Sequence, residues 1–298
     1  MYNALDFKYF QYINMLATIW NTIFFNPLLN LMILLYDFFG NNLGLAILGI
    51  AVIGRLIMIP LVKKQTAMTK KMASLKPELE KLQKKYGENK EKLSQEQIKL
   101  YKKVGYNPLG CVGTFIPQLI ILSALVGVIR AVTNSDLEGL YPWVINMTEI
   151  GTDTAINTKF LFWELTTSYK AVSGEFGKFS LEALPYIALS VFVGITQYFT
   201  TIFTQKMQQV GAPKKKEVKK KKDVSQDPSM EDMQEKMQNS TMLLLPVMTA
   251  FFTISMPAAL GWYWMLQSLL LVIQYLSLDF DKTKKGIQNL LDILQKKK

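Results

Sequence analysis

The chain has 298 residues, of which 50% are hydrophobic and 19% are charged, with a net charge of +11 and a mean hydropathy of +0.15. The absence of His and the single Cys, Cys111, exclude Ser-His triads, imidazole acid–base chemistry, internal disulfides and paired-Cys metal or redox sites. The apolar residues are gathered in uncharged runs of about 20 residues, which is the length that crosses a ~30 Å hydrocarbon core. We therefore predict an all-α polytopic membrane helical bundle that is not an enzyme and needs no metal or cofactor.

The N-terminal segment, residues 1–42, contains an uncharged stretch from Tyr9 to Tyr36 that Pro27 divides. Four asparagines interrupt this stretch, at Asn14, Asn21, Asn26 and Asn30. The part that follows Pro27 offers only ~14 Å of helix, which is too short to cross a membrane. We therefore predict an interfacial helix over 28–39 at the outer surface. The alternative that stays open is a sixth, N-terminal span or an uncleaved signal.

Five membrane spans are predicted after this segment, at 43–62, 108–132, 183–205, 241–256 and 257–278. The last two come from one uncharged run of 42 residues, Met237 to Leu278, which is ~63 Å of helix and must cross twice. Pro257 supplies the point of reversal, because proline cannot continue the helical hydrogen-bond ladder.

The segments between the spans differ in charge. Residues 63–107 hold 13 Lys and Arg against 5 Asp and Glu, and the basic loop 206–240 and the tail 279–298 are also net positive. The loop 133–182 holds 3 against 7. Lys and Arg accumulate on the cytoplasmic side of membrane proteins. We therefore predict that loop 133–182 and the N-terminus lie outside and that the C-terminus is cytoplasmic.

Residues 63–107 are predicted to form a helical hairpin in the cytoplasm. One apolar stripe is formed by Met68, Met72, Leu75, Leu79, Leu82 and Tyr86, and the facing stripe by Ile98, Tyr101 and Val104. Gly87 is expected to end the first helix. Pro77 predicts a break inside that helix, and Ser94 with Gln97 predicts a capping box at the start of the second.

Arg55 lies inside the first predicted span, ~12 Å from its inner edge, where an Arg costs at least ~2.5–3.5 kcal/mol. One interpretation is a side chain that snorkels to the interface. We favour a hydrated groove, because an intramembrane ionisable residue is by default a functional one. No Asp, Glu or Lys lies in the predicted spans, so we expect the partner of Arg55 to be an acidic group on a passing substrate.

Polar residues at helical spacing on the other spans are candidates for lining the same groove. They are Gln118 on the second span, Gln197 and Thr201 on the third, and Tyr263, Trp264 and Gln267 on the fifth. Taken singly, each of the hydroxyl and amide groups is more commonly used for hydrogen bonds between helices. Their combination with Arg55 is what favours the groove.

Several short stretches form a pattern when they are taken in chain order. They are Arg55-Leu56 with Pro60-Leu61, Lys76-Pro77-Glu78, Leu82 to Tyr86, Leu100 to Lys103, Gly105 to Pro108, Gly110-Cys111, Phe160 to Leu165, and Pro257 to Leu260 with Tyr263-Trp264. The pattern resembles the YidC-type membrane protein insertases of the Oxa/Alb superfamily. The resemblance implies an insertase and chaperone without covalent chemistry, whose groove arginine is Arg55. It places the third-span glutamine at Gln197 and the last-span aromatic at Trp264, beside Tyr263.

The same resemblance implies nascent membrane-protein clients and the lipid bilayer as partners, for a protein that works as a monomer in a bacterial cell (plasma) membrane. The basic loop and tail would suit ribosomal RNA, and both ribosome binding and cooperation with a Sec-type channel stay open. The alternative function is a small organic-anion transporter in which Arg55 binds the substrate carboxylate. A groove closed toward the outside would favour the insertase, and a pore with polar ends on both sides would favour the transporter.

Overall fold

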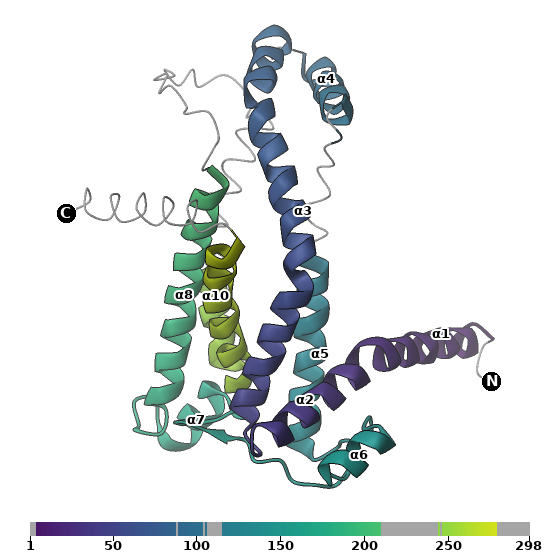
Figure 1. Ribbon diagram of the computed structural model, residues 1–298, viewed down its shortest axis with the longest axis vertical. Helices are drawn as coiled ribbons and strands as arrows, with labels where there is room; N and C mark the ends of the chain where they lie inside the picture. The colour runs from purple at the N-terminus through teal and green to yellow at the C-terminus, as the bar shows by residue number, and fades with distance from the viewer. Residues whose placement is uncertain are drawn as a thin grey trace. The chain divides into compact units, whose positions relative to one another are not determined.

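The structure, a computed structural model, describes residues 4–87, 89–103, 105, 115–209, 244 and 246–278 (Figure 1). The described chain is predominantly helical with one two-stranded β-hairpin, which confirms the predicted fold class. The first helices are α1 (Ala4–Trp20), the π-helix η1 (Asn21–Phe25), α2 (Asn26–Phe38), α3 (Leu43–Tyr86), α4 (Lys90–Lys103) and α5 (Phe115–Asn134). They are followed by α6 (Pro142–Thr148), the strands β1 (Lys159–Phe160) and β2 (Trp163–Glu164), α7 (Tyr169–Phe176), α8 (Leu184–Gln209) and α10 (Ala258–Leu278).

Five of the described helices are long and apolar enough to cross a membrane: Gln11–Phe38, Leu43–Lys64, Pro117–Asn134, Leu184–Thr204 and Ala258–Ser277. The last four overlap the spans predicted at 43–62, 108–132, 183–205 and 257–278. The span predicted at 241–256 corresponds in the described residues to a shorter apolar helix, Pro246–Ser255. Part of it falls outside the described residues, as do Val104, Cys111, residues 210–240 of the basic loop 206–240, and the tail 279–298.

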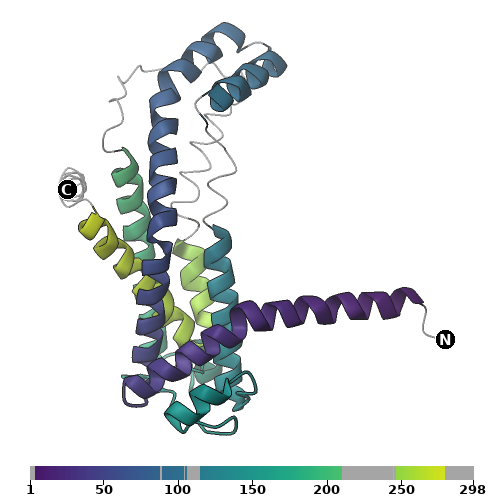
Figure 2. The ribbon, with the colours of Figure 1, turned by 45° about the vertical axis from the view of Figure 1, so that its right-hand side comes forward.

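The N-terminal helix does not begin after Pro27, because α1, η1 and α2 follow one another without a break. Pro27 occupies the first turn of α2, and the preceding turn is widened to a π-helix that closes with a bond from Asn26 N–H to Asn21 O. A π-turn absorbs the clash that proline makes with the turn before it. Figures 1 and 2 show α1 and α2 running obliquely to α5. Because Gln11–Phe38 has the length and composition of a span, both interpretations of this segment stay open.

The chain folds as two compact units. The first contains residues 1–56, 116–194 and 249–270, and the second contains 57–115, 195–248 and 271–298. Helices α3, α8 and α10 each contribute residues to both units.

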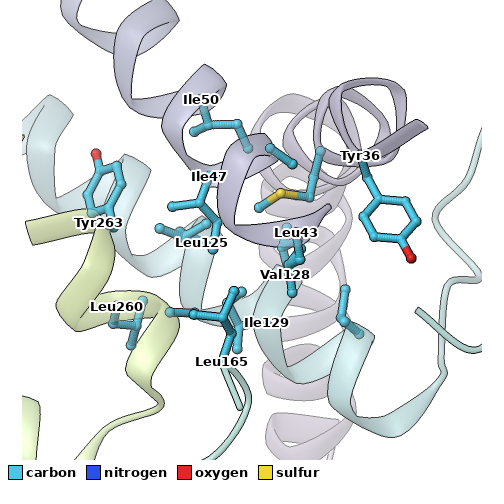
Figure 3. Packing of buried hydrophobic residues seen from close by; sticks show 14 of the residues in the cluster. Tyr36, Leu43, Ile47, Ile50, Leu125, Val128, Ile129, Leu165, Leu260 and Tyr263 are labelled. Atoms are coloured by element: carbon cyan, nitrogen blue, oxygen red, sulfur yellow. The ribbon is translucent and has the colours of Figure 1, made fainter. Parts of the chain in front are cut away.

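The core of the first unit is built from one face each of α2, α3, α5, α8 and α10 and from the connection between α5 and α8 (Figure 3). Leu43, Ile47 and Ile50 recur at the i, i+4, i+7 spacing of a helix face on α3. They pack with Leu125, Val128 and Ile129 of α5, with Leu260 and Tyr263 of α10, and with Leu165 after β2. The buried face of α2 adds Leu29, Met32, Ile33 and Tyr36.

Asn30, one of the asparagines that interrupt the N-terminal apolar stretch, fastens α2 to the segment before α6. Its Nδ2 donates to Gly139 O at 2.8 Å, and its Oδ1 accepts from Tyr141 N at 2.7 Å. The side chain is buried and its amide bonds backbone groups that would otherwise be left without partners in a dry place.

The second unit contains the hairpin of α3 and α4, which lie side by side in both ribbon views (Figures 1 and 2). Leu75 and Leu79 of α3 pack against Tyr101 of α4, as the stripes predicted. Three details of the prediction are wrong. Helix α3 continues through Pro77 as one helix of 44 residues, since the contacts of Leu75 and Leu79 hold the turns on both sides of the proline. Ile98 is exposed and Gln97 is buried in its place.

The third wrong detail is the start of α4. The helix begins at Lys90 and is capped by Asn89, whose Oδ1 accepts from Lys92 N at 3.0 Å. Ser94 and Gln97 therefore lie inside the helix, where they cannot form a capping box.

Candidate functional site

Arg55 lies ~18 Å along the candidate span Leu43–Lys64, well inside an apolar helix. Its side chain is partly buried, and its Nη2 donates a hydrogen bond of 2.5 Å to the main-chain oxygen of Gln267 on α10. A carbonyl oxygen carries only a partial negative charge. This bond therefore orients the guanidinium without neutralising it.

Gln267 completes a reciprocal tie between α3 and α10. Its buried side chain donates from Nε2 to Ala51 O at 3.5 Å, one turn before Arg55 on α3. Each helix thus offers one polar side chain to the backbone of the other. Bonds of this kind hold transmembrane helices together where apolar surface gives no driving force.

The hydroxyl of Tyr263 lies on the same side of α10, with Gln118 of α5, Arg55 and Gln267 as its polar neighbours. Tyr263 is fully buried, yet within the described residues its Oη completes no hydrogen bond. A buried hydroxyl without a partner is costly. Four predicted groove residues, Arg55, Gln118, Tyr263 and Gln267, are therefore brought together in the first unit, with Trp264 partly buried against its core.

Gln197 and Thr201 lie on the part of α8 that belongs to the second unit. The Thr201 hydroxyl donates to Gln197 O at 2.7 Å, and the Thr204 hydroxyl donates to Thr200 O at 2.7 Å. These hydroxyl protons are used inside the helix, which is the common state of Thr in an apolar helix. Their oxygens can still accept bonds, and a role in lining a groove stays a prediction.

An aromatic cap at the end of the first unit where α3, α8 and α10 begin was not foreseen as a site. We define it as Phe160, Trp163 and Trp262; the ring centroids of Phe160 and Trp163 lie 5.1 and 6.1 Å from that of Trp262. Trp262 Nε1 donates to Gly44 O on α3, and Trp163 Nε1 donates to Pro185 O on α8, both at 2.9 Å. A Cβ at Gly44 would overlap the Phe160 ring, so only glycine permits this approach.

Backbone bonds fix the cap to α10. Ala258 N donates to Thr167 O and Ala259 N donates to Leu165 O, both at 2.8 Å. The first N–H groups of a helix have no partner inside it. The segment after β2 supplies those partners, while Leu165 fills the core beneath. The only sequence signal for the cap was the run from Phe160 to Leu165, which the resemblance singled out without assigning it a role.

In the part of the chain that the structure describes, no group of three or more Cys, Asp or Glu residues is placed to hold a metal ion.

Comparison with known proteins gives the family. The sequence profile of the family described as "60Kd inner membrane protein" matches residues 34–285. The chain belongs to this family of YidC-type membrane protein insertases. It is 32% identical to membrane protein insertase YidC 2 of Bacillus anthracis over 261 residues, which are 86% of this chain and 79% of that protein.

Other relatives extend the likeness beyond one group of bacteria. Membrane protein insertase MisCA of Bacillus subtilis (strain 168) is 27% identical over 90% of this chain and 82% of its own length. The chloroplastic ALBINO3-like protein 1 of Arabidopsis thaliana is 26% identical over 85% of this chain and 46% of its own length.

Membership of the family settles the general function. The chain is a multi-pass membrane protein with the function of a membrane insertase, and insertases are not enzymes. Its clients are nascent membrane proteins, and it works with the lipid bilayer. The bacterial relatives indicate a plasma membrane.

Proposed function

We propose that Arg55, Gln118, Tyr263 and Gln267 form the polar floor of a groove that receives the hydrophilic flank of a nascent membrane protein. The observation that carries the proposal is the Arg55 guanidinium, held part-way along an apolar span by a main-chain oxygen. The Tyr263 hydroxyl beside it is buried and completes no hydrogen bond within the described residues, so it would bond a client group once the packing over it opens. Trp264, in the same unit, is proposed as further lining, and a lining role for Gln197 and Thr201 of α8 stays a proposal from the sequence.

The energetics suit one acidic residue at a time. A carboxylate at the bilayer centre costs about 2.5–3.5 kcal/mol. A guanidinium at about 4 Å returns up to about 4 kcal/mol at an effective dielectric constant near 20. Arg55 would therefore offset most of the penalty for one acidic residue that crosses. The apolar residues of the client, worth about 0.3–0.6 kcal/mol each, then drive its helix into lipid without nucleotide hydrolysis.

The aromatic cap supports the insertase mechanism over a transporter. Phe160, Trp163 and Trp262 cover the end of the first unit at which α3, α8 and α10 begin. A carrier must open to both sides of the membrane in turn. An insertase needs its groove open only to the side from which the client enters and to the lipid.

The charge distribution supports the proposed orientation, with the α3–α4 hairpin and the C-terminus in the cytoplasm and the N-terminus outside. In that orientation the cap lies on the outer side of the membrane. Contact of the basic loop and tail with a ribosome, cooperation with a Sec-type channel, and function as a monomer are further proposals.

The test is reconstitution in liposomes with a single-span client whose translocated tail carries one acidic residue. We expect Arg55→Ala to lower insertion about tenfold or more, since each 1.36 kcal/mol is tenfold. Arg55→Lys should keep part of the activity, because the charge remains while the planar fork is lost.

Two matched controls accompany this test. Arg130→Ala removes an exposed arginine at the end of α5 and should leave insertion unchanged. A client whose tail has Gln in place of the acid should depend much less on Arg55. Full insertion of the acidic client by Arg55→Ala would contradict the proposal.

A further inference from the structure

The connection between α5 and α8, residues 135–183, exposes large apolar side chains that its surroundings do not explain. Leu161 is 70% exposed, Phe162 78%, and Phe179 and Leu181 82% each. This connection is the acidic one, with seven Asp and Glu against three Lys. Exposed apolar side chains grouped in an otherwise polar segment mark a contact surface.

The strongest sign is the turn between β1 and β2. Phe160 pairs with Trp163, so Leu161 and Phe162 form a two-residue turn. Leu161 has φ +53°, in the left-handed region where turns of this kind normally place Gly or Asn. A leucine here is strained. The turn thus carries two large apolar side chains where turn geometry favours small or polar residues, which a purely structural turn would not require.

The β1–β2 hairpin is held against the first residues of the spans. Trp163 Nε1 and Glu164 N bond to Pro185 O and Tyr186 Oη at the start of α8. Phe160 packs on Gly44 at the start of α3 and on Trp262 near the start of α10. Three candidate spans begin at these contacts. The turn therefore lies at the surface of the membrane that these helices enter.

The second part of the apolar surface runs directly into α8. Phe179 and Leu181 precede Leu184, the first residue of the candidate span Leu184–Thr204. On that span Val191 and Phe192 are exposed and therefore face lipid. Exposed apolar side chains thus recur along the chain from the connection to the lipid-facing side of the helix, with Leu184 between them.

The basic residues of the connection accompany the apolar ones. Lys159 is two positions before Leu161, and Lys178 is next to Phe179; both side chains are exposed, as is that of Glu182 next to Leu181. Lysines that flank apolar residues at an interface keep their charge among the phosphates while their stems lie along the lipid.

We propose that Leu161, Phe162, Phe179 and Leu181 form an interfacial anchor, inserted into the lipid leaflet at the face of the α5–α8 connection, with Lys159 and Lys178 on anionic phospholipid headgroups. The anchor would fix the depth of the cap, and with it the depth of the polar cluster around Arg55, relative to the bilayer. The proposal rests on the protein's being embedded in a membrane and does not depend on the groove mechanism.

The experiment places an environment-sensitive bimane probe at single cysteines in a Cys111→Ser background. The positions are Phe162→Cys and Phe179→Cys, with Ala155→Cys as a matched control because Ala155 is exposed in the same connection. The protein is reconstituted in vesicles of phosphatidylcholine and phosphatidylglycerol. Quenching is measured with nitroxide-labelled lipid and with iodide present on both sides of the membrane.

At positions 162 and 179 we expect quenching by the labelled lipid and protection from iodide by about threefold or more relative to position 155, as for an apolar face sunk below the headgroups. Equal iodide quenching at all three positions would overturn the anchor. Protection from both quenchers would also overturn it, because it would mean that protein covers the surface.

The lysines are tested separately in the Phe162→Cys protein. Changing Lys159 and Lys178 to Gln should abolish any gain in lipid quenching that phosphatidylglycerol gives over pure phosphatidylcholine. If phosphatidylglycerol gives no gain in the protein with both lysines, the assignment of headgroup contacts is wrong.

Discussion

The two halves of α3 differ in which apolar side chains are exposed and which are buried. In the membrane half, Leu56 and Ile57 are exposed, while Arg55 turns its charged group to α10. In the hairpin half, Leu75 and Leu79 are buried against α4. The surroundings change from lipid to water along this one helix. Apolar side chains are therefore exposed in the membrane half and buried in the hairpin half. What an exposed or buried side chain means therefore depends on the solvent it faces.

The largest expected effect comes from breaking this contrast at two matched positions. Ile57 and Ile98 are both exposed, by 69% and 47%, but Ile57 lies in a span and Ile98 on α4. Ile57→Asp should cost about 3 kcal/mol of membrane integration. Ile98→Asp should change stability by no more than about 0.5 kcal/mol. Both variants are compared by their membrane integration and by their thermal midpoint in detergent. Equal effects of the two substitutions would contradict the assignment of lipid around Ile57 and water around Ile98.

A smaller effect is expected inside the hairpin. Leu79→Ala leaves a cavity in the small cluster with Leu75 and Tyr101, and should destabilise the α3–α4 pairing by about 2 kcal/mol. Hydrogen exchange of the α4 amides reports this loss, while the exchange of α5 should stay unchanged. Lys84→Ala, at an exposed position on the same helix, is the control and should leave exchange as it was.

The smallest effect concerns the exposed pair of Lys99 and Glu96, whose Nζ and Oε1 lie 2.6 Å apart. The hydrogen bond and charge of Glu96 raise the pKa of the Lys99 ammonium. Because water screens the pair, it adds at most a small stabilisation at neutral pH, and this is lost as pH rises through the raised pKa of Lys99. Glu96→Gln should lower that pKa, as followed by NMR titration, without a measurable change in hairpin stability.

Most of the fold could be predicted from patterns of hydrophobicity in the sequence. Long uncharged runs identify apolar helices whatever their tertiary contacts. The apolar stripe that contains Leu75 and Leu79 predicts that a partner helix packs against it. The position of Arg55 within a span also follows from counting residues. Its bond to the Gln267 backbone does not, because sequence gives no rotation of one helix against another.

The errors have two physical causes: packing outweighs a local break signal, and one local capping residue takes the place of another. Pro77 does not break α3, and Asn89 caps α4 where Ser94 had been expected to. Pro27 is accommodated by a π-turn that no residue pattern announces. The left-handed Leu161 could not be read from the chain either, since leucine rarely adopts that conformation.

The contact that orients Arg55 has a consequence for how the protein tolerates change. Its acceptor is the main-chain oxygen of residue 267, and every one of the twenty amino acids carries that atom. Substituting the Gln267 side chain would remove the hydrogen bond to Ala51 O, yet the hydrogen bond from the Arg55 guanidinium to the main-chain oxygen would persist. The position of the Arg55 charge is therefore set by the backbone of α10. The side chain at position 267 can vary during evolution without loss of the bond that orients Arg55.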